Sequence, residues 1–98
     1  MYVLKTTEEY SKWLKKLRDL NARAAVLKRM VRVGNGNLGD YKSVGGGVLE
    51  LRIDYGPGYR VYFTIQGNEI ILLLIGGDKS TQKADIKLAQ SLKKECEA

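Results

Sequence analysis

The chain has 98 residues, of which 44% are hydrophobic and 29% are charged, and its formal net charge at pH 7 is +6. That length fits one domain over residues 1–98, and that composition excludes an intrinsically disordered chain. One cysteine, Cys96, and no histidine exclude an internal disulfide and a cysteine-based zinc site, so we expect no metal. The chain has no signal peptide and no run of about 18 apolar residues, which favours a cytoplasmic location without membrane contact.

Residues 2–5 predict a short strand, and a helix is expected to follow it as far as about residue 18. Thr6 is the expected N-cap of this helix, because Glu9 stands three residues later as in a capping box. Apolar side chains recur at helical spacing along it, which indicates a face turned to the core. Trp13 lies within that stripe, so a core position is favoured over stacking on bases.

A second helix is predicted over residues 19–33, and Arg29 and Arg32 are expected outside its inner face. Between Lys12 and Arg32 the chain holds eight basic residues against one acidic residue, Asp19. A basic helical surface favours nucleic acid, an acidic ribosomal surface or an acidic partner protein, although a plain solvated helix face has the same composition. The two helices are expected to form an antiparallel pair on a sheet. The candidate contacts with RNA or the ribosome are Lys12, Lys15, Lys16, Arg29, Arg32 and Lys42.

Two strands of alternating polarity are predicted over residues 48–54 and 59–65, joined by a glycine–proline turn. Successive strand residues point to opposite faces, so the apolar residues of both strands turn to the core. Any hairpin register that permits this places Arg52 and Arg60 together on the other face, either directly paired or diagonal. The two like charges repel each other unless nearby carboxylates or an anionic ligand offset them.

The turn after the second strand, residues 66–69, has glycine at its first central position, as a type II′ hairpin prefers. Pairing Gln66 with Glu69 across this turn sets Arg60 opposite Ile75 on a third strand, and Lys79 follows four residues later. We therefore expect Arg52, Arg60 and Lys79 to gather near one edge of one sheet face.

Six aliphatic residues in a row at 70–75 predict a central strand that is covered on both faces. The helix pair covers one face, and either a C-terminal helix, expected over about residues 81–95, or a partner protein covers the other. In the second case Ile71, Leu73 and Ile75 form a docking surface. Together the elements predict an α+β fold in which two N-terminal helices pack on an antiparallel β-sheet with a C-terminal helix.

Short motifs spread over nearly the whole chain resemble those of a known superfamily. They are Trp13-Leu14 with Leu17 and Asp19; Gly36-Asn37 with Gly39-Asp40; Gly47-Val48 with Glu50-Leu51-Arg52; Gly56-Pro57-Gly58-Tyr59-Arg60-Val61-Tyr62; and Gly76-Gly77-Asp78-Lys79 with Gln82, Asp85-Ile86 and Ala89. By these motifs the chain resembles the RelE/ParE toxin superfamily, and within it the HigB-like branch of addiction module killer proteins.

The resemblance implies a RelE-like fold and the toxin of a type II toxin–antitoxin system. It implies an endoribonuclease, or mRNA interferase, that blocks translation by cutting mRNA on the ribosome through attack of a ribose 2′-OH on the adjacent phosphate, without a metal or other cofactor. The implied partners are the 70S ribosome with its mRNA and a helix-turn-helix, HigA-like antitoxin. Two alternatives stay open, since the superfamily also includes ParE-like DNA gyrase inhibitors, and an inactive module would only bind its antitoxin.

The resemblance also implies roles for three basic residues. Arg60 matches the central phosphate-binding arginine of the family, and Arg52 matches a second basic position on the neighbouring strand. Lys79 falls where such toxins often carry a basic residue that helps the leaving group. An arginine suits bidentate contact with phosphate, and electrostatic stabilisation of developing charge often contributes more to catalysis than any other effect.

Two acidic residues depart from the family pattern. Glu50 stands where the RelE type has a lysine, and Asp85 stands near its catalytic tyrosine. The candidate proton-transfer groups are therefore Glu50, Asp85, Tyr62 and Lys79. Glu50 beside Arg52 is either a general base or an ion pair that offsets the arginines, and Asp85 is either a catalytic group or an ordinary residue of a first helical turn.

Overall fold

The computed structural model describes residues 1–97, which form five strands, three α-helices and one short 3₁₀ turn. In chain order these elements are β1 (Val3–Thr6), α1 (Glu8–Lys16), α2 (Leu20–Gly34), β2 (Tyr41–Gly45), β3 (Val48–Ile53), β4 (Tyr59–Gln66), β5 (Ile70–Gly77), η1 (Lys79–Thr81) and α3 (Gln82–Glu97). Within residues 1–97, no helix is both long enough and apolar enough to cross a membrane.

The five strands form one sheet in the order β1-β5-β4-β3-β2. The strands β2 to β5 pair antiparallel with their neighbours, whereas β1 pairs in parallel with β5. Parallel pairing requires a long connection between the two strands, and here two helices and three strands supply it. The predicted α+β fold is confirmed, and the expected antiparallel sheet is corrected at this one pair.

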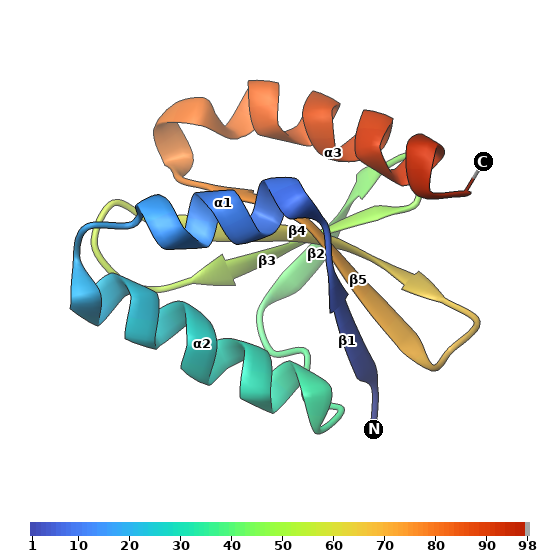
Figure 1. The fold of residues 1–98 in the computed structure, drawn as a ribbon, viewed down its shortest axis with the longest axis horizontal. Coiled ribbons are helices and arrows are strands. Elements are labelled where there is room, and N and C mark those ends of the chain that lie inside the picture. Colours follow the sequence, from blue (N-terminus) through green and yellow to red (C-terminus); the bar gives the residue numbers. More distant parts are fainter. Residues whose placement is uncertain (98) are drawn as a thin grey trace.

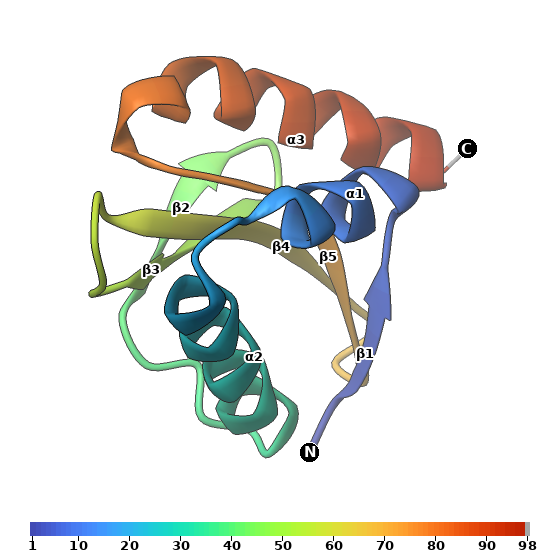
Figure 2. The same ribbon diagram turned by 60° about the vertical axis from the view of Figure 1, so that its left-hand side comes forward.

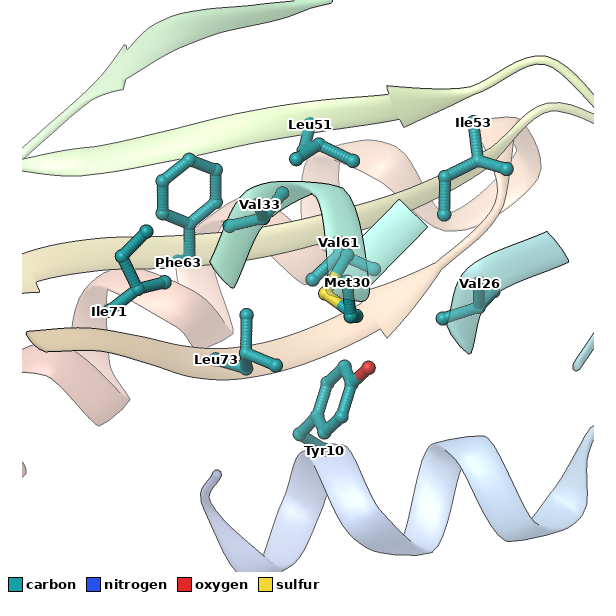
Figure 3. Close-up of a cluster of buried hydrophobic side chains, with 10 residues drawn as sticks. All are labelled: Tyr10, Val26, Met30, Val33, Leu51, Ile53, Val61, Phe63, Ile71 and Leu73. Atoms are coloured by element: carbon teal, nitrogen blue, oxygen red, sulfur yellow. The ribbon is translucent and has the colours of Figure 1, made fainter. Parts of the chain in front are cut away.

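The helices cover both faces of the sheet, with α2 on one face and α3 on the other (Figures 1 and 2). The helix α1 lies over β5 and turns Tyr10 toward α2 (Figure 3). The larger core fills the space between α2 and the sheet, and it takes the apolar side of β3 and β4 that strand alternation predicts. Its buried side chains are Tyr10, Val26, Met30, Val33, Leu51, Ile53, Val61, Phe63, Ile71 and Leu73.

A second core lies beneath α3, where Ala89 and Leu92 pack on β4 and β5. The chain's own last helix, and not a partner, therefore covers this face of the sheet. Ile71 and Leu73 are buried in the core on the α2 side, and Ile75 is buried in the core on the α3 side. The prediction of an exposed docking surface formed by these three residues is wrong.

The turn between β4 and β5 differs from the predicted type II′ turn. Gly67 and Asn68 both have positive φ, as in a type I′ turn. The strands pair from Gln66 with Ile70, one residue later than the predicted pairing of Gln66 with Glu69. Every residue of β5 is therefore displaced by one position relative to β4 from the start of the hairpin.

A β-bulge in β5 adds a second displacement. Leu74 has no partner on β4, because the register shifts beside Tyr62, which pairs with Ile75. The extra residue turns Ile75 to the same side as Leu74, toward α3. As a result Arg60 lies opposite Gly77 and not opposite Ile75 as predicted.

The helix starts are set by side chains that bind the first backbone N–H groups. The N-cap of α1 is Thr7 and not the predicted Thr6, because Thr7 Oγ1 accepts from Tyr10 N at 3.0 Å and also donates to the carbonyl of Leu74 at 2.6 Å. That second bond ties α1 to β5 and decides between the two adjacent threonines. Asp19 caps α2, as the predicted start of that helix requires.

Candidate functional site

Arg60 lies at the end of the sheet where β3, β4 and β5 approach the start of α3. It pairs across the strands with Arg52 on one side and Gly77 on the other. Its Nη1 donates to the carbonyl of Gly58 at 2.8 Å, and its side chain is 11% exposed. The guanidinium is therefore fixed against the backbone and meets solvent over only a small part of its surface.

A fully buried carboxylate, Glu50, lies behind Arg60. Its Oε2 is 3.6 Å from Arg60 Nε and accepts hydrogen bonds from the Tyr62 hydroxyl at 3.1 Å and from Gln82 Nε2 at 2.8 Å. This geometry fits the interpretation of Glu50 as an ion-pair partner. The arginine that it offsets is Arg60, diagonally across the strands, and not its neighbour Arg52.

The Glu50–Arg60 pair is incompletely satisfied. Among residues 1–97, neither Glu50 Oε1 nor Arg60 Nε has a hydrogen-bond partner, although Lys42 Nζ lies 3.9 Å from Glu50 Oε1. Burial and the neighbouring Glu50 raise the pKa of Tyr62 well above its usual range, so its hydroxyl stays protonated and donates. Buried polar atoms without partners are rare in proteins and direct attention to a functional role for this cluster.

Arg52 points into solvent and is held by a different carboxylate, Asp40. Arg52 Nε lies 3.2 Å from Asp40 Oδ2, and Nη2 donates to Oδ1 at 3.3 Å. The two arginines line one shallow hollow of about 320 Å³, together with Asp40, Asp54 and Tyr59. The prediction that Arg52 and Arg60 share one sheet face is confirmed, and of the two arrangements left open the structure has the direct pair, with open space in front of it.

Lys79 begins η1 and is exposed, two residues beyond the Gly77 that pairs with Arg60. The backbone of Lys79 therefore lies at the end of the sheet where Arg60 is found. Asp78, just before it, accepts hydrogen bonds from Ser80 N and Ser80 Oγ, which lower the pKa of Asp78. Asp78 thus acts as the cap of η1.

Asp85 lies in the first turn of α3, and its carboxylate rests against Gly77 of β5. Its Oδ2 accepts from Thr81 Oγ1 at 2.6 Å, and burial raises the pKa of Asp85. Unlike Glu50, Asp85 lines a hollow, one of about 510 Å³ between α1 and the start of α3. Within residues 1–97, no three carboxylate or cysteine side chains are grouped so as to hold a metal ion.

Most of the basic residues predicted to contact RNA or the ribosome are exposed. Lys12 forms an ion pair with Glu8 at 3.3 Å, and Lys12 and Lys16 line the same hollow as Asp85. The exposed residues of the set are Lys12, Lys15, Lys16, Arg32 and Lys42. Their roles in binding stay predictions.

Arg29 is the exception, because it is buried and not on the outer side of α2. Its Nη1 donates to the carbonyl of Leu38 at 2.9 Å, and its Nη2 donates to that of Asp40 at 3.4 Å. The loop after α2 folds back over the helix, and Gly39 passes so close to the guanidinium that a Cβ there would lie 2.5 Å from it. Arg29 therefore ties the loop to α2, and the expectation that it lies outside the inner face is wrong.

An Arg29→Met variant is expected to lower the free energy of unfolding by about 1–3 kcal/mol, because two loop carbonyls lose a charged donor. Chemical denaturation measures the change. The matched control is Arg32→Met, since Arg32 is exposed on the same helix and its replacement should change stability by about 0.5 kcal/mol or less. Equal losses of stability in the two variants would contradict a stabilising role for the hydrogen bonds from Arg29 to the loop.

Gln82 and Asp40 contribute to the site, although neither was a predicted site residue. In the sequence analysis both appear only within the motifs that carry the family resemblance. The inward direction of Gln82 could have been predicted from helical spacing. Gln82 stands seven positions before the buried Ala89 and therefore lies on the same inward side of α3. No pattern in the sequence pointed to the contact between Asp40 and Arg52, because that contact depends on how the loop before β2 is folded.

Comparisons with known proteins agree with the observed fold. The family model "Phage derived protein Gp49-like (DUF891)" matches residues 8–94. An uncharacterized protein of Haemophilus influenzae (strain Rd) is 51% identical over 92 residues, which are 94% of this chain and 93% of that protein.

Two solved structures from Escherichia coli are similar in fold. The isolated RelE toxin superposes with a TM-score of 0.66 at 18% identity, over 90% of this chain and 99% of RelE. A chain of the intact RelBE toxin–antitoxin complex superposes with a TM-score of 0.63 at 17% identity, over 80% of this chain and 96% of that chain. The expected RelE-like fold is confirmed.

Proposed function

We propose that this chain, which belongs to the phage-derived Gp49-like family and has the fold of RelE, is the toxin of a type II toxin–antitoxin system. Its proposed activity is that of a ribosome-dependent mRNA endonuclease that blocks translation in the cytoplasm. The partner proposed for its neutralisation is an antitoxin, by analogy with the toxin–antitoxin complex of E. coli RelBE, and specifically a helix-turn-helix protein of the HigA kind.

The observation that carries this proposal is the fixed guanidinium of Arg60 beside open space. Its Nη1 is bound to the backbone and its Nε faces Glu50, while no hydrogen bond occupies Nη2 among residues 1–97. Arg52 lines the same hollow from the neighbouring strand. Two arginines around one hollow suit an anion with several oxygens, such as an RNA phosphate.

The proposed reaction is attack of a ribose 2′-oxygen on the adjacent phosphorus, with cleavage of the bond to the 5′-oxygen. The products are a 2′,3′-cyclic phosphate and a free 5′-hydroxyl. Arg60 stabilises the negative charge that develops on the phosphorane oxygens, and Arg52 assists it. Fixing Arg60 in advance avoids reorganisation during the reaction, and this is the role of Glu50 behind it.

Proton transfer in this reaction falls to groups that a substrate can reach. Glu50 and Tyr62 are both fully buried, so they do not exchange protons with RNA. Glu50 pairs with Arg60 and orients it, and Tyr62 donates to Glu50. Lys79 is exposed at the same end of the sheet and is the proposed donor to the leaving 5′-oxygen. The 2′-hydroxyl proton passes to solvent water in the open hollow, while the Lys79 ammonium gives its proton to the leaving 5′-oxygen.

The test is a cell-free translation reaction with the purified chain, in which the 5′ ends of the mRNA are mapped with and without ribosomes. Cuts are expected only on translating ribosomes. Arg60→Lys keeps a positive charge beside Glu50 but loses the planar fork, so cleavage should fall by about 10²-fold or more. Arg18→Lys, between α1 and α2 and away from the two arginines of the site, is the matched control and should cut like the parent chain.

Three outcomes would redirect the proposal. Intact mRNA with inhibited gyrase supercoiling would support a ParE-like inhibitor in place of a nuclease. Intact mRNA and active gyrase, with tight antitoxin binding, would indicate a module without catalytic activity. Cleavage by Arg60→Lys equal to that of the parent chain would remove Arg60 from the reaction.

A further inference from the structure

Two adjacent glycines at the end of β5 allow side chains of two different helices to lie directly on the strand. A Cβ on Gly76 would lie 2.2 to 2.4 Å from three ring atoms of Trp13 in α1. A Cβ on Gly77 would lie 1.9 Å from Asp85 Oδ2 in α3. The absence of both Cβ atoms thus brings an indole ring and a carboxylate to the same short stretch of strand.

These two side chains face one hollow of about 510 Å³, a volume in the range of small-molecule sites. Tyr59 adds a second aromatic ring to its lining, and the charged side chains there are Lys12 and Lys16 together with Glu9, Asp78 and Asp85. The floor is continuous with the proposed catalytic site, because Gly77 pairs with Arg60 across β4 and β5. Tyr59 also lines the hollow in front of the two arginines, so it stands between the two spaces.

We propose that this hollow holds one base of the RNA and that Asp85 recognises guanine there; the inference rests on the proposed endonuclease activity and names its specificity-determining residue. A base held in a protein is read by stacking on aromatic rings and by hydrogen bonds to its Watson–Crick edge. Trp13 and Tyr59 supply the aromatic surface, and Lys16 supplies a counter-charge for a flanking phosphate, whereas Lys12 is already paired with Glu8.

Guanine presents the hydrogen-bond donors that match the acceptors of Asp85. Thr81 Oγ1 donates to Asp85 Oδ2, which leaves Oδ1 and one lone pair of Oδ2 free to accept further bonds. Guanine is the RNA base whose Watson–Crick edge presents two adjacent N–H donors, at N1 and N2. The Thr81 hydrogen bond fixes the rotation of the carboxylate, so both acceptors are held in place before the base arrives.

The first arm of the test measures binding without catalysis. The chain has one tryptophan, so Trp13 gives a single indole N–H signal in an NMR spectrum. Titration with GMP is expected to shift this signal at concentrations at least about tenfold lower than AMP, CMP or UMP, as a two-bond contact discriminates between bases. Asp85→Asn should remove the advantage of GMP, whereas the control Glu69→Gln, in the exposed β4–β5 turn, should keep it.

The second arm maps cut positions in the cell-free translation reaction. The parent chain is expected to enrich guanine at one fixed position relative to the cut, and Asp85→Asn should abolish that enrichment. Unchanged enrichment in Asp85→Asn would overturn the inference while leaving the nuclease intact. Loss of all cuts together with undiminished preference for GMP would also overturn it, because Asp85 would then act in the chemistry. A shift of the indole signal by GMP without any cleavage by the parent chain would support the pocket and refute the proposed activity.

Discussion

An Arg60→Ala variant is expected to lose about 3 kcal/mol of unfolding free energy in addition to its activity, because it leaves the carboxylate of Glu50 buried without a counter-charge. Glu50 is fully buried and its ion pair with Arg60 spans 3.6 Å. Inactivity of this variant alone would therefore not separate a lost phosphate contact from a lost fold. Urea denaturation of the purified variant measures the loss of stability directly.

The double variant Arg60→Met/Glu50→Gln separates the two effects. The amide introduced at position 50 would still accept from Tyr62 and Gln82, and no charge would remain buried at the pair, so most of the lost stability should return. Cleavage should remain abolished, since the guanidinium is still missing. A double variant that is as unstable as Arg60→Ala would show that the two charges do not depend on each other, and a double variant that cuts mRNA would refute the role of Arg60.

Strand alternation predicted the part of this site that depends on local geometry. The core faces of β3 and β4 and the position of Arg52 and Arg60 on one common face follow from the two-residue repeat of a strand and are confirmed, whereas the choice of direct over diagonal pairing was left open by that repeat. The register with β5 was not predictable in the same way. The wrong turn type and the unpaired Leu74 each displaced the strand by one residue, and together they moved Gly77 into the place expected for Ile75.

The partners of the charged residues depended on contacts that are distant in sequence. Arg52 is closer to Glu50 along β3, yet it pairs with Asp40 from the preceding loop, which leaves Glu50 to Arg60. Arg29 has the helical spacing of the buried residues Val26 and Val33, and its guanidinium is covered by the loop that returns over α2. A periodic pattern records which side of an element a residue occupies and does not record what later covers that side.

A Gly76→Ala variant is expected to reduce the free energy of unfolding by about 3 kcal/mol, the upper end of the usual cost of overpacking. The added methyl would lie 2.2 to 2.4 Å from the Trp13 ring. The ring is half-buried between the two cores, so it has little room to move without parting α1 from β5. Thermal unfolding should show the loss, and the emission of the single tryptophan should shift toward longer wavelength as the ring becomes exposed.

Two comparisons decide whether the Trp13 ring is the cause. Gly34→Ala, at the end of α2, meets only Leu4 atoms at 3.8 Å, so this control should leave stability unchanged or raise it slightly. In a Trp13→Leu background the clash partner is smaller, so adding Gly76→Ala should cost clearly less than it does in the parent chain. An equal cost in both backgrounds would mean that Gly76 is required for a reason other than the approach of the indole. A smaller cost would establish that this glycine is what allows α1 to lie close against β5, beside the proposed base pocket.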